Sequence, residues 1–430
     1  MTSTVFQGSK RKLITQFAVV ALVCTSAFGM DLPKQDRDTA FAVAVASGQV
    51  YIGGTVIGSL PGFSSAGQSD AFVESYDQSG NLLWSQQFGS SKDEQVLGMA
   101  ADATGAYAAG YTMGSLPGQK SAGSTDAFLA KYSPTGALLW LHQFGASGID
   151  RLEAATSDGT SVYVCGYTDS SLYGQPFAGD QDVFVQKWDQ SGDLLWTREI
   201  GTPGLDRSYG IAVNANGVFV TGRTKGTFAG QTSSGGIDAF VTMFDLNGNQ
   251  IWLTQFGTPS DERGWGISLD STGVYVTGRT EGSFPGYTNQ GGDDAYMAKF
   301  NFSGSMLWVN EFGTSQFDRG TAAATDATGA YSAGYTEGSL PGNTNEGSFD
   351  CYIRKFDTSG DVLWTIEFGT TGYDQIWGAV TDSTGLYLAG ATGGTLPGQT
   401  AKSGFFLAKY TTAGALLWLR ETGTKAIKIP

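Results

Sequence analysis

The chain has 430 residues, with 25 Lys and Arg against 40 Asp and Glu, so its formal net charge is −15. This acidic balance argues against nucleic acid, whose phosphates need a basic surface, and against docking on anionic lipid. A single histidine and three cysteines also leave little material for His-based zinc sites or a disulfide framework.

The N-terminal segment has the pattern of a secretory signal peptide. Three basic residues at 10–12 precede an apolar run over 13–24, and Ala27 and Gly29 are small residues at the two positions a signal peptidase reads. An uncleaved membrane anchor is the alternative, but the run is too short to span a bilayer and contains Gln16. We expect a signal peptide over 1–29 and a linker over 30–37. The mature protein is then secreted, extracellular or periplasmic, without membrane insertion, and its charge is 22 − 40 = −18.

A tryptophan recurs along the rest of the chain at nearly constant spacing. It lies in near-copies of the segment 245–257, which ends Ile-Trp-Leu-Thr-Gln-Phe-Gly. The spacing is 56 residues five times and then 54, which indicates a repeat architecture. The seven copies are centred on Trp84, Trp140, Trp196, Trp252, Trp308, Trp364 and Trp418.

Each period contains four short apolar segments separated by turn residues. In the fifth copy they cover 266–269, 274–278, 294–300 and 306–312. Their length and their β-branched and aromatic residues predict strands, and no segment has a sustained helical period. The sequence therefore predicts an all-β, seven-bladed β-propeller over 38–424, with four antiparallel strands per blade and a 56-residue repeat.

The turns assign two faces to this propeller. Two connections per copy are tight Asp/Asn-x-x-Gly turns, which we place on a bottom face, whereas the long glycine-rich connection (282–292 in the fifth copy) and the blade-to-blade links form the top face. The recurrent tryptophan should wedge between neighbouring blades; stacking on a ligand is the alternative. Cys165 and Cys351 fall in different copies and should be buried and unpaired.

The chain order predicts how the ring closes. The first strand, near 42–45, should be innermost and the last, near 416–421, outermost, so every blade is continuous in sequence. Closure then depends on blade one packing against blade seven, and the tail over 425–430 is a candidate to cover that seam. Small residues in the innermost strands should allow seven strands to crowd one axis: Gly98, Ala154, Gly210, Gly266, Ala322 and Gly378.

The repeated unit also resembles a known family. The segment 126–132 (Asp-Ala-Phe-Leu-Ala-Lys-Tyr) runs on to Leu139-Trp140 and Phe144-Gly145. This pattern resembles the seven-bladed β-propeller repeat (SBBP) family of secreted, mostly bacterial proteins, which implies the fold and export and brings no catalytic residues. A looser likeness to the tryptophan-docking motif of quinoprotein propellers implies packing only, without a quinone.

Two acidic series keep the period on the predicted top face. One opens each innermost strand and includes Asp150, Asp206, Glu262, Asp318 and Asp374; the other opens the third strand, as at Asp294. A carboxylate ring binding Ca²⁺ is one interpretation, because calcium takes oxygen ligands. The other, which we favour, is that each carboxylate holds its own loop, since no Asp-x-Asp-x-Asp run appears and no metal or cofactor is otherwise indicated.

Positions that break the repeat are the candidates for a binding site. Three residues after each member of the first acidic series, the side chains differ from blade to blade and include Tyr209, Trp265 and Trp377. Arg223 and Arg279 replace the tyrosine found elsewhere at the end of the second strand. These five residues predict a one-sided patch at the mouth of the central channel, where aromatic rings would stack on sugars or peptide side chains. The alternative is that the rings only fill space between loops.

Catalysis finds little support in the sequence. His142, the only histidine, lies in a predicted outer strand, so Ser-His-Asp and Cys-His arrangements are excluded. We therefore expect an exported, monomeric, non-enzymatic module that binds an extracellular glycan or protein through its top face. A structural surface scaffold without a discrete ligand is one alternative. A glycoside-acting enzyme with paired carboxylates is the other, and with 40 acidic residues it stays open.

Overall fold

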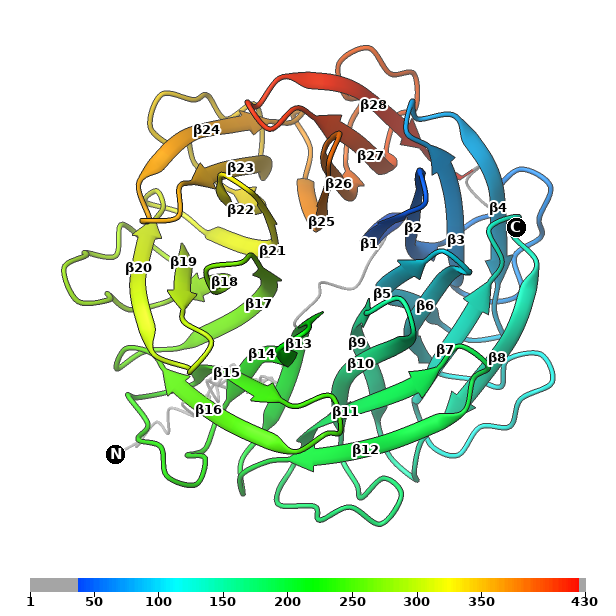
Figure 1. The fold of residues 1–430 in the computed structure, drawn as a ribbon. Helices are drawn as coiled ribbons and strands as arrows, with labels where there is room; N and C mark the ends of the chain where they lie inside the picture. The colour runs from blue at the N-terminus through cyan, green and yellow to red at the C-terminus, as the bar shows by residue number, and fades with distance from the viewer. Residues whose placement is uncertain (1–37, 425–430) are drawn as a thin grey trace, which may run out of the picture. The chain divides into compact units, whose positions relative to one another are not determined.

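The computed structural model describes residues 38–424. The predicted signal peptide (1–29), linker (30–37) and tail (425–430) lie outside the described residues. Within 38–424 the chain forms 28 strands and no helix, arranged as seven four-stranded antiparallel sheets around one axis (Figure 1). The predicted all-β, seven-bladed propeller is confirmed. Over the same range, no helix is long and apolar enough to cross a membrane.

Each blade contributes one strand to each of four concentric positions. The innermost strands are β1 (Thr39–Ala46), β5 (Glu94–Asp102), β9 (Asp150–Ser157), β13 (Asp206–Asn214), β17 (Glu262–Leu269), β21 (Asp318–Asp326) and β25 (Asp374–Asp382). The second strands are β2 (Gln49–Val56), β6 (Gly105–Thr112), β10 (Ser161–Thr168), β14 (Gly217–Thr224), β18 (Val274–Thr280), β22 (Gly329–Thr336) and β26 (Gly385–Thr392). The third strands are β3 (Asp70–Asp77), β7 (Asp126–Tyr132), β11 (Asp182–Asp189), β15 (Asp238–Phe244), β19 (Asp294–Phe300), β23 (Asp350–Phe356) and β27 (Gly404–Tyr410). The outermost strands are β4 (Leu82–Phe88), β8 (Leu138–Phe144), β12 (Leu194–Ile200), β16 (Gln250–Phe256), β20 (Met306–Phe312), β24 (Val362–Phe368) and β28 (Leu416–Thr422).

Every sheet is built from four consecutive strands. The first sheet has the order β1-β2-β3-β4 and the last β25-β26-β27-β28, so no strand is exchanged between the ends of the chain. The innermost strand β1 contacts both β5 and β25, which closes the ring. The prediction that blade one packs directly against blade seven is therefore confirmed.

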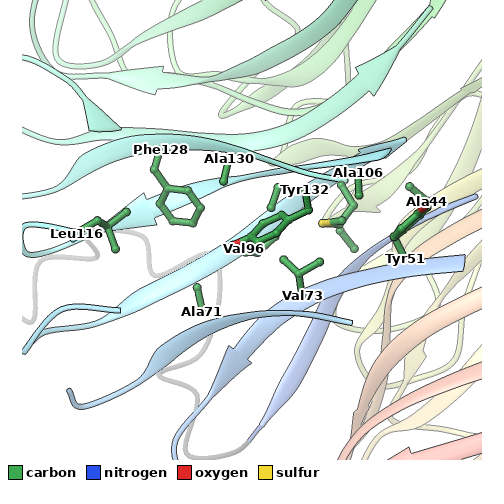
Figure 2. Close-up of a cluster of buried hydrophobic side chains, with 13 residues drawn as sticks. Ala44, Tyr51, Ala71, Val73, Val96, Ala106, Leu116, Phe128, Ala130 and Tyr132 are labelled. Atoms are coloured by element: carbon green, nitrogen blue, oxygen red, sulfur yellow. The ribbon is translucent and has the colours of Figure 1, made fainter. Parts of the chain in front are cut away.

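The cores of the propeller lie between blades. One buried cluster joins Ala44, Tyr51 and Val73 of blade one to Phe128 and Tyr132 of blade two (Figure 2). Comparable clusters fill the other junctions. Cys165 and Cys351 are fully buried within two of them and form no disulfide, as expected.

The recurrent tryptophan connects each blade to the next at the bottom face. Trp84 Nε1 donates to the Pro134 carbonyl at 2.9 Å, and Trp252 Nε1 donates to the Phe302 carbonyl at 2.9 Å. Each acceptor lies in the tight turn of the following blade, 50 residues along the chain. The wedge between neighbouring blades is confirmed.

A glycine is required in that same turn for two separate reasons. Gly136 has φ +87°, a left-handed conformation that disfavours residues with a Cβ, and an added Cβ would lie 2.8 Å from the Trp84 ring. The contact recurs around the ring, with the tryptophan of one blade lying on the turn glycine of the next. At the closing seam Trp418 lies against Gly80 (2.9 Å to an added Cβ) and donates to the Gln78 carbonyl at 3.0 Å.

Small residues are also necessary near the axis. A Cβ added to Gly98 would lie 2.7 Å from the Cα of Ala154 in the neighbouring innermost strand. A Cβ added to Gly266 would lie 2.7 Å from the carbonyl carbon of Ala322. Neighbouring innermost strands thus pack backbone against backbone, which is the crowding that the sequence predicted.

The closing seam should be the weakest junction, because no peptide bond connects blade seven to blade one. We expect Trp418→Ala to lower the free energy of unfolding by about 3 kcal/mol, the usual cost of truncating a large packed side chain. Denaturant unfolding followed by far-UV circular dichroism measures this loss.

Trp252→Ala is the matched control, because it removes the same contact where the chain is continuous. Hydrogen exchange should show faster opening of β28 and of the turn after β3 in Trp418→Ala than of the corresponding segments in Trp252→Ala. Equal exchange at the two junctions would contradict a distinct seam.

Candidate functional site

Each innermost strand carries a β-bulge at the same position. In blade five the pairing of β17 with β18 shifts register between Gly264 and Gly266, which leaves Trp265 as the extra residue. The bulge explains why β17 begins at Glu262, four residues before its predicted start, whereas β19 and β20 have the predicted bounds. A bulge bends its strand and redirects one side chain. We call the seven bulge residues the axial row: Phe41, Leu97, Glu153, Tyr209, Trp265, Thr321 and Trp377.

The axial row has the same backbone bulge in every blade, but its side chains differ from blade to blade. Phe41, Leu97 and Thr321 are buried, whereas Glu153 and the three aromatic residues named as site candidates are half-buried. The Trp377 ring contacts the next member of the row, Phe41, with ring centroids 5.9 Å apart. The row therefore offers partly accessible aromatic rings in blades four, five and seven only.

Two of the predicted aromatic residues belong to one contact network. Trp377 lies 5.8 Å from the Tyr335 ring, and Arg319 lies with its guanidinium carbon 5.9 Å from Tyr335 and 6.0 Å from Trp265. Arg319 of blade six therefore contacts Trp265 of blade five directly and is connected to Trp377 of blade seven through Tyr335. We call this set and the rings that contact it the aromatic network: Phe41, Trp265, Phe317, Arg319, Tyr335, Phe349, Tyr373 and Trp377.

Only Trp265 and Trp377 of this network were among the predicted site residues, and the other six members, Arg319 included, were not. Phe317 and Tyr373 are 43% and 46% exposed, and Phe349 packs between Tyr335 and Tyr373 at 5.2 and 5.5 Å. Phe317 and Tyr373 directly precede the acidic residue that opens β21 and β25. A signal was present, because this position changes from blade to blade just as the axial row does.

Arg319 is held in place from two sides. Its Nε donates to Asp293 Oδ2 at 2.5 Å, and its Nη1 donates to the Tyr335 hydroxyl at 3.1 Å. Burial raises the pKa of Tyr335, so the phenol stays neutral and can accept this bond. The Arg319 side chain keeps 30% of its surface exposed. It is thus a fixed, partly accessible cation among aromatic rings.

Arg223 and Arg279 lie elsewhere than expected. They are only 3% and 4% exposed, so they do not form the accessible cationic part of the patch. Arg279 instead donates from Nη1 to Asp293 Oδ1 at 2.5 Å, so Asp293 bridges it to Arg319. Each of the two also lies directly opposite another arginine across its sheet, Arg223 opposite Arg207 and Arg279 opposite Arg263.

Tyr209 lies close to Arg151 in a second group of side chains. It lies on β13 in blade four, on the side where Arg151 forms an ion pair with Glu153 at 3.1 Å and stacks on Tyr111 at 4.1 Å. The structure therefore brings together Trp265 and Trp377, while Tyr209 belongs to a second group of arginine and tyrosine side chains in blades two to four.

The first acidic series holds its own loops. Asp206 Oδ2 accepts from the Thr202 amide at 2.6 Å, and Asp150 accepts from the Ala146 amide at 2.7 Å and the Thr168 hydroxyl at 2.6 Å. Glu262, Asp318 and Asp374 bind their loops in the same way. Across residues 38–424, no group of three or more His, Cys, Asp and Glu side chains has an arrangement that would hold a metal ion. The five carboxylates named for a calcium ring thus serve separate loops.

A second set of carboxylates forms pairs beneath the top loops. In blades one, two and four, a glutamine of the outermost strand donates to the aspartate that opens the third strand, as Gln255 Nε2 does to Asp238 Oδ2 at 2.6 Å. In blades three, five and six a glutamate replaces that glutamine, so two carboxyl groups face each other. The pairs are Glu199 with Asp182, Glu311 with Asp294 and Glu367 with Asp350.

Burial and the neighbouring aspartate favour the protonated form of these glutamates. Burial raises the pKa of Glu199, Glu311 and Glu367 to about 7, and the facing carboxylate adds to the shift. One oxygen of each glutamate also accepts from a loop amide, as Glu311 does from Phe284 at 2.7 Å. Three equivalent pairs that each hold a loop are typical of structure, although the sequence analysis did not identify them.

The remaining candidates are packed or lie away from the axis. His142 is stacked between Trp140 and Trp188, with centroids 5.3 and 5.4 Å away, as its packing role predicts. A pocket of about 480 Å³ lies between the outer strands of blades four and five, lined by Phe284, Met306 and Leu307 among others. It includes none of the predicted site residues.

Comparisons with known proteins leave the function open. No family model matches the chain. A 175-residue alignment with the regulatory protein FlaEY of Caulobacter vibrioides has 31% identity and covers 37% of this chain and 18% of that protein. A WD repeat-containing protein, L264 of Acanthamoeba polyphaga mimivirus, is 23% identical over 430 residues, 74% of this chain and 31% of that protein. This chain therefore spans less than a third of the length of either relative.

Similar solved structures are WD40-like and other propellers. The WD40 domain of Neurospora crassa Pan2 has a TM-score of 0.48 and 12% identity, covering 84% of this chain and 88% of that one. The β-propeller domain of the Trilobed protease from Pyrococcus furiosus has a TM-score of 0.48 and 10% identity, covering 90% and 95%. At this level of similarity nothing about function follows from them.

The carboxyl pairs predict a stability that falls as the pH rises. The folded-state pKa of these glutamates, about 7, exceeds the ordinary value of 4.5, so the stability they contribute is complete below pH 4.5 and is lost as the pH rises to about 7. The triple variant Glu199→Gln/Glu311→Gln/Glu367→Gln places in blades three, five and six the glutamine found in blades one, two and four. At pH 8 it should gain about 2 kcal/mol per site in unfolding free energy. Denaturant unfolding between pH 4.5 and 8.5 measures the change.

The reciprocal variant Gln255→Glu is the control. It creates a fourth carboxyl pair with Asp238 and should lower the unfolding free energy at pH 8 while changing little at pH 4.5. Parallel pH profiles for the wild type and the triple variant would show that the pairs do not titrate as described.

Proposed function

We propose that this protein is an exported, non-enzymatic binding module that holds a glycan or protein at the axial end of its top face. The observation that carries the proposal is the aromatic network. It occupies positions where the repeat breaks, and it combines two exposed rings, Phe317 and Tyr373, with the half-buried Trp265 and Trp377 around one fixed arginine. Exposed aromatic rings beside arginine are the residues most often found at binding hot spots.

Packing alone does not explain why tryptophans occupy these axial positions. The same axial positions in blades two and six hold Leu97 and Thr321, and the fold forms the same bulge there. The fold therefore does not need a tryptophan at this position for its stability. A large aromatic ring that is only half-buried contributes less to stability than a buried one, whereas its accessible face is available to a ligand.

Export and family membership are part of this proposal. Export is supported by the basic and apolar pattern over 10–24 and by the acidic composition. Membership of the SBBP family is supported by the seven copies of the repeat motif. A monomer and the absence of a cofactor fit a closed ring whose acidic residues are bound to their own loops.

The contribution of the aromatic network is tested by the double variant Trp265→Ala/Trp377→Ala. The purified protein is screened against a glycan array and a peptide library, and the best ligand is then titrated by calorimetry. We expect the double variant to bind that ligand at least about tenfold more weakly, because removing a central aromatic residue at an interface typically has such an effect.

Tyr287→Ala is the matched control. Tyr287 is an aromatic residue of the top loop in blade five, 36% exposed and outside the aromatic network. Binding that is unchanged in the double variant, or weakened as much by Tyr287→Ala, would rule out the axial site. Failure of every glycan and peptide to bind would favour the scaffold alternative instead.

A further inference from the structure

The donor groups left at the aromatic network point to the chemistry of its ligand. Arg319 donates from Nε to Asp293 and from Nη1 to Tyr335, and neither of these bonds uses Nη2. Trp377 Nε1 is enclosed and has no hydrogen-bond partner within residues 38–424. Both side chains contact the Tyr335 ring. The Arg319 side chain remains partly exposed, so a ligand that reaches it should supply hydrogen-bond acceptors.

The wall around the aromatic network is rich in arginine. Six arginines lie at two neighbouring positions near the top of the first and second strands in blades three to six: Arg151, Arg207, Arg223, Arg263, Arg279 and Arg319. The same positions in blades one, two and seven hold no arginine. In a chain with a net charge of −15, this is a local concentration of arginine on one side of the axis, partly neutralised by Glu153 and Asp293.

The fold does not require this arrangement. Arg207 lies directly opposite Arg223, and Arg263 directly opposite Arg279, across antiparallel strand pairs. Like charges directly opposite on neighbouring strands are destabilising, and burying a guanidinium has a further desolvation cost. Blade two fills the equivalent pair with Gln95 and Tyr111 without changing the bulge or the sheet. Local costs of this kind are expected where function selects the residues.

We infer that the aromatic network binds an anionic saccharide, with a sugar ring on Trp265 and its acidic group on Arg319. This inference rests on the binding function proposed above and names the ligand class for that site. The Arg319 guanidinium stays charged at every physiological pH, and Asp293 and Tyr335 already fix its orientation, so little side-chain entropy is lost when it binds a carboxylate.

A saccharide fits the position of the rings better than a folded protein does. Trp265 and Trp377 are half-buried in the axial row rather than raised on the rim. A flat, slender chain of pyranose rings reaches such recessed faces, and the apolar C–H face of a pyranose stacks on an indole. The exposed rings of Phe317 and Tyr373 lie within the same contact network, where they provide further stacking surfaces for a chain of several sugars.

The test compares charged and uncharged forms of one sugar chain. Oligogalacturonate, its methyl ester, a sulfated oligosaccharide and poly-glutamate are titrated into the purified protein by calorimetry at low and moderate salt. We expect oligogalacturonate to bind at least about tenfold more tightly than the methyl ester, because a charge-assisted hydrogen bond has about this effect on affinity. Its affinity should also fall with added salt. The sulfated sugar shows whether the acidic group must be a carboxylate.

The key variant takes its replacement from the chain itself. Arg319→Gln copies Gln95 and Gln375 at the same position in blades two and seven, and Arg279 remains to pair with Asp293. It should weaken oligogalacturonate about tenfold or more while leaving the melting temperature nearly unchanged. Trp377→Phe keeps a ring and removes Nε1, and it should weaken the same ligand less.

Arg420→Gln is the matched charge control. Arg420 Nε donates to the Gly80 carbonyl at 2.9 Å at the bottom of the closing seam. Gln86 of blade one makes the equivalent bond to the carbonyl of Gly136. The control should bind oligogalacturonate like the wild type. An equal loss of affinity in Arg420→Gln and in Arg319→Gln would show a general charge effect and overturn the site.

The possible results separate this inference from the function on which it rests. Equal binding of the acid and its methyl ester, abolished by Trp265→Ala/Trp377→Ala, would overturn the anionic class and keep the binding site. Binding of poly-glutamate without any saccharide, lost in Arg319→Gln, would overturn the saccharide and assign an acidic peptide. No binding by any probe, together with no hit in the array and the library, would overturn both proposals.

Discussion

The contact of a tryptophan with the turn glycine of the next blade is the constraint on which the propeller depends. Each blade is a small sheet that cannot bury both of its faces alone, and this contact sets how closely the next sheet approaches. The indole needs a surface without a Cβ, and the turn needs a residue with positive φ. Gly136 beneath Trp84 satisfies both conditions at once. Neither residue can change alone, so the pair recurs in every blade, including the seam that Trp418 closes on Gly80.

This constraint divides the repeat into fixed and variable positions. The fixed positions are the turn glycines, the wedged tryptophans and the acids of the first series, which hold the loops. They have the same role in every blade, so the same residue types recur. The bulge in the innermost strand is also common to all blades, but it constrains only the backbone, so its side chain is free to differ. Asp293 illustrates the same freedom: the equivalent position is Ile237 in blade four and Phe349 in blade six, and only in blade five does it fix two arginines.

The sequence predicted the architecture closely because the architecture is what the repeat encodes. Blade number, strand order, the wedge of Trp84 and the direct closure between the first and last blades all follow from patterns that return seven times. The site was predicted less completely. Periodicity located Trp265 and Trp377 as exceptions, but it could not show that Arg279 is drawn into an ion pair inside the wall, because Asp293 lies 14 residues away, outside the strand that carries Arg279. Nor could it show which exceptions touch one another, since Arg319 and Trp265 meet only across a blade boundary.

A repeat of seven equal units can form a single binding site only near its axis. At the outer rim five of the seven blades expose a similar apolar pair, such as Leu82 and Leu83 or Leu416 and Leu417, and these pairs are separated by the width of a blade. Near the axis the innermost strands contact one another, so exceptions in neighbouring blades merge into one surface. The path from Trp265 through Arg319 and Tyr335 to Trp377 crosses three blades by side-chain contacts alone. A few differences in neighbouring blades are therefore enough to give a symmetric fold one asymmetric site, and the charge of Arg319 gives that site a preference among ligands.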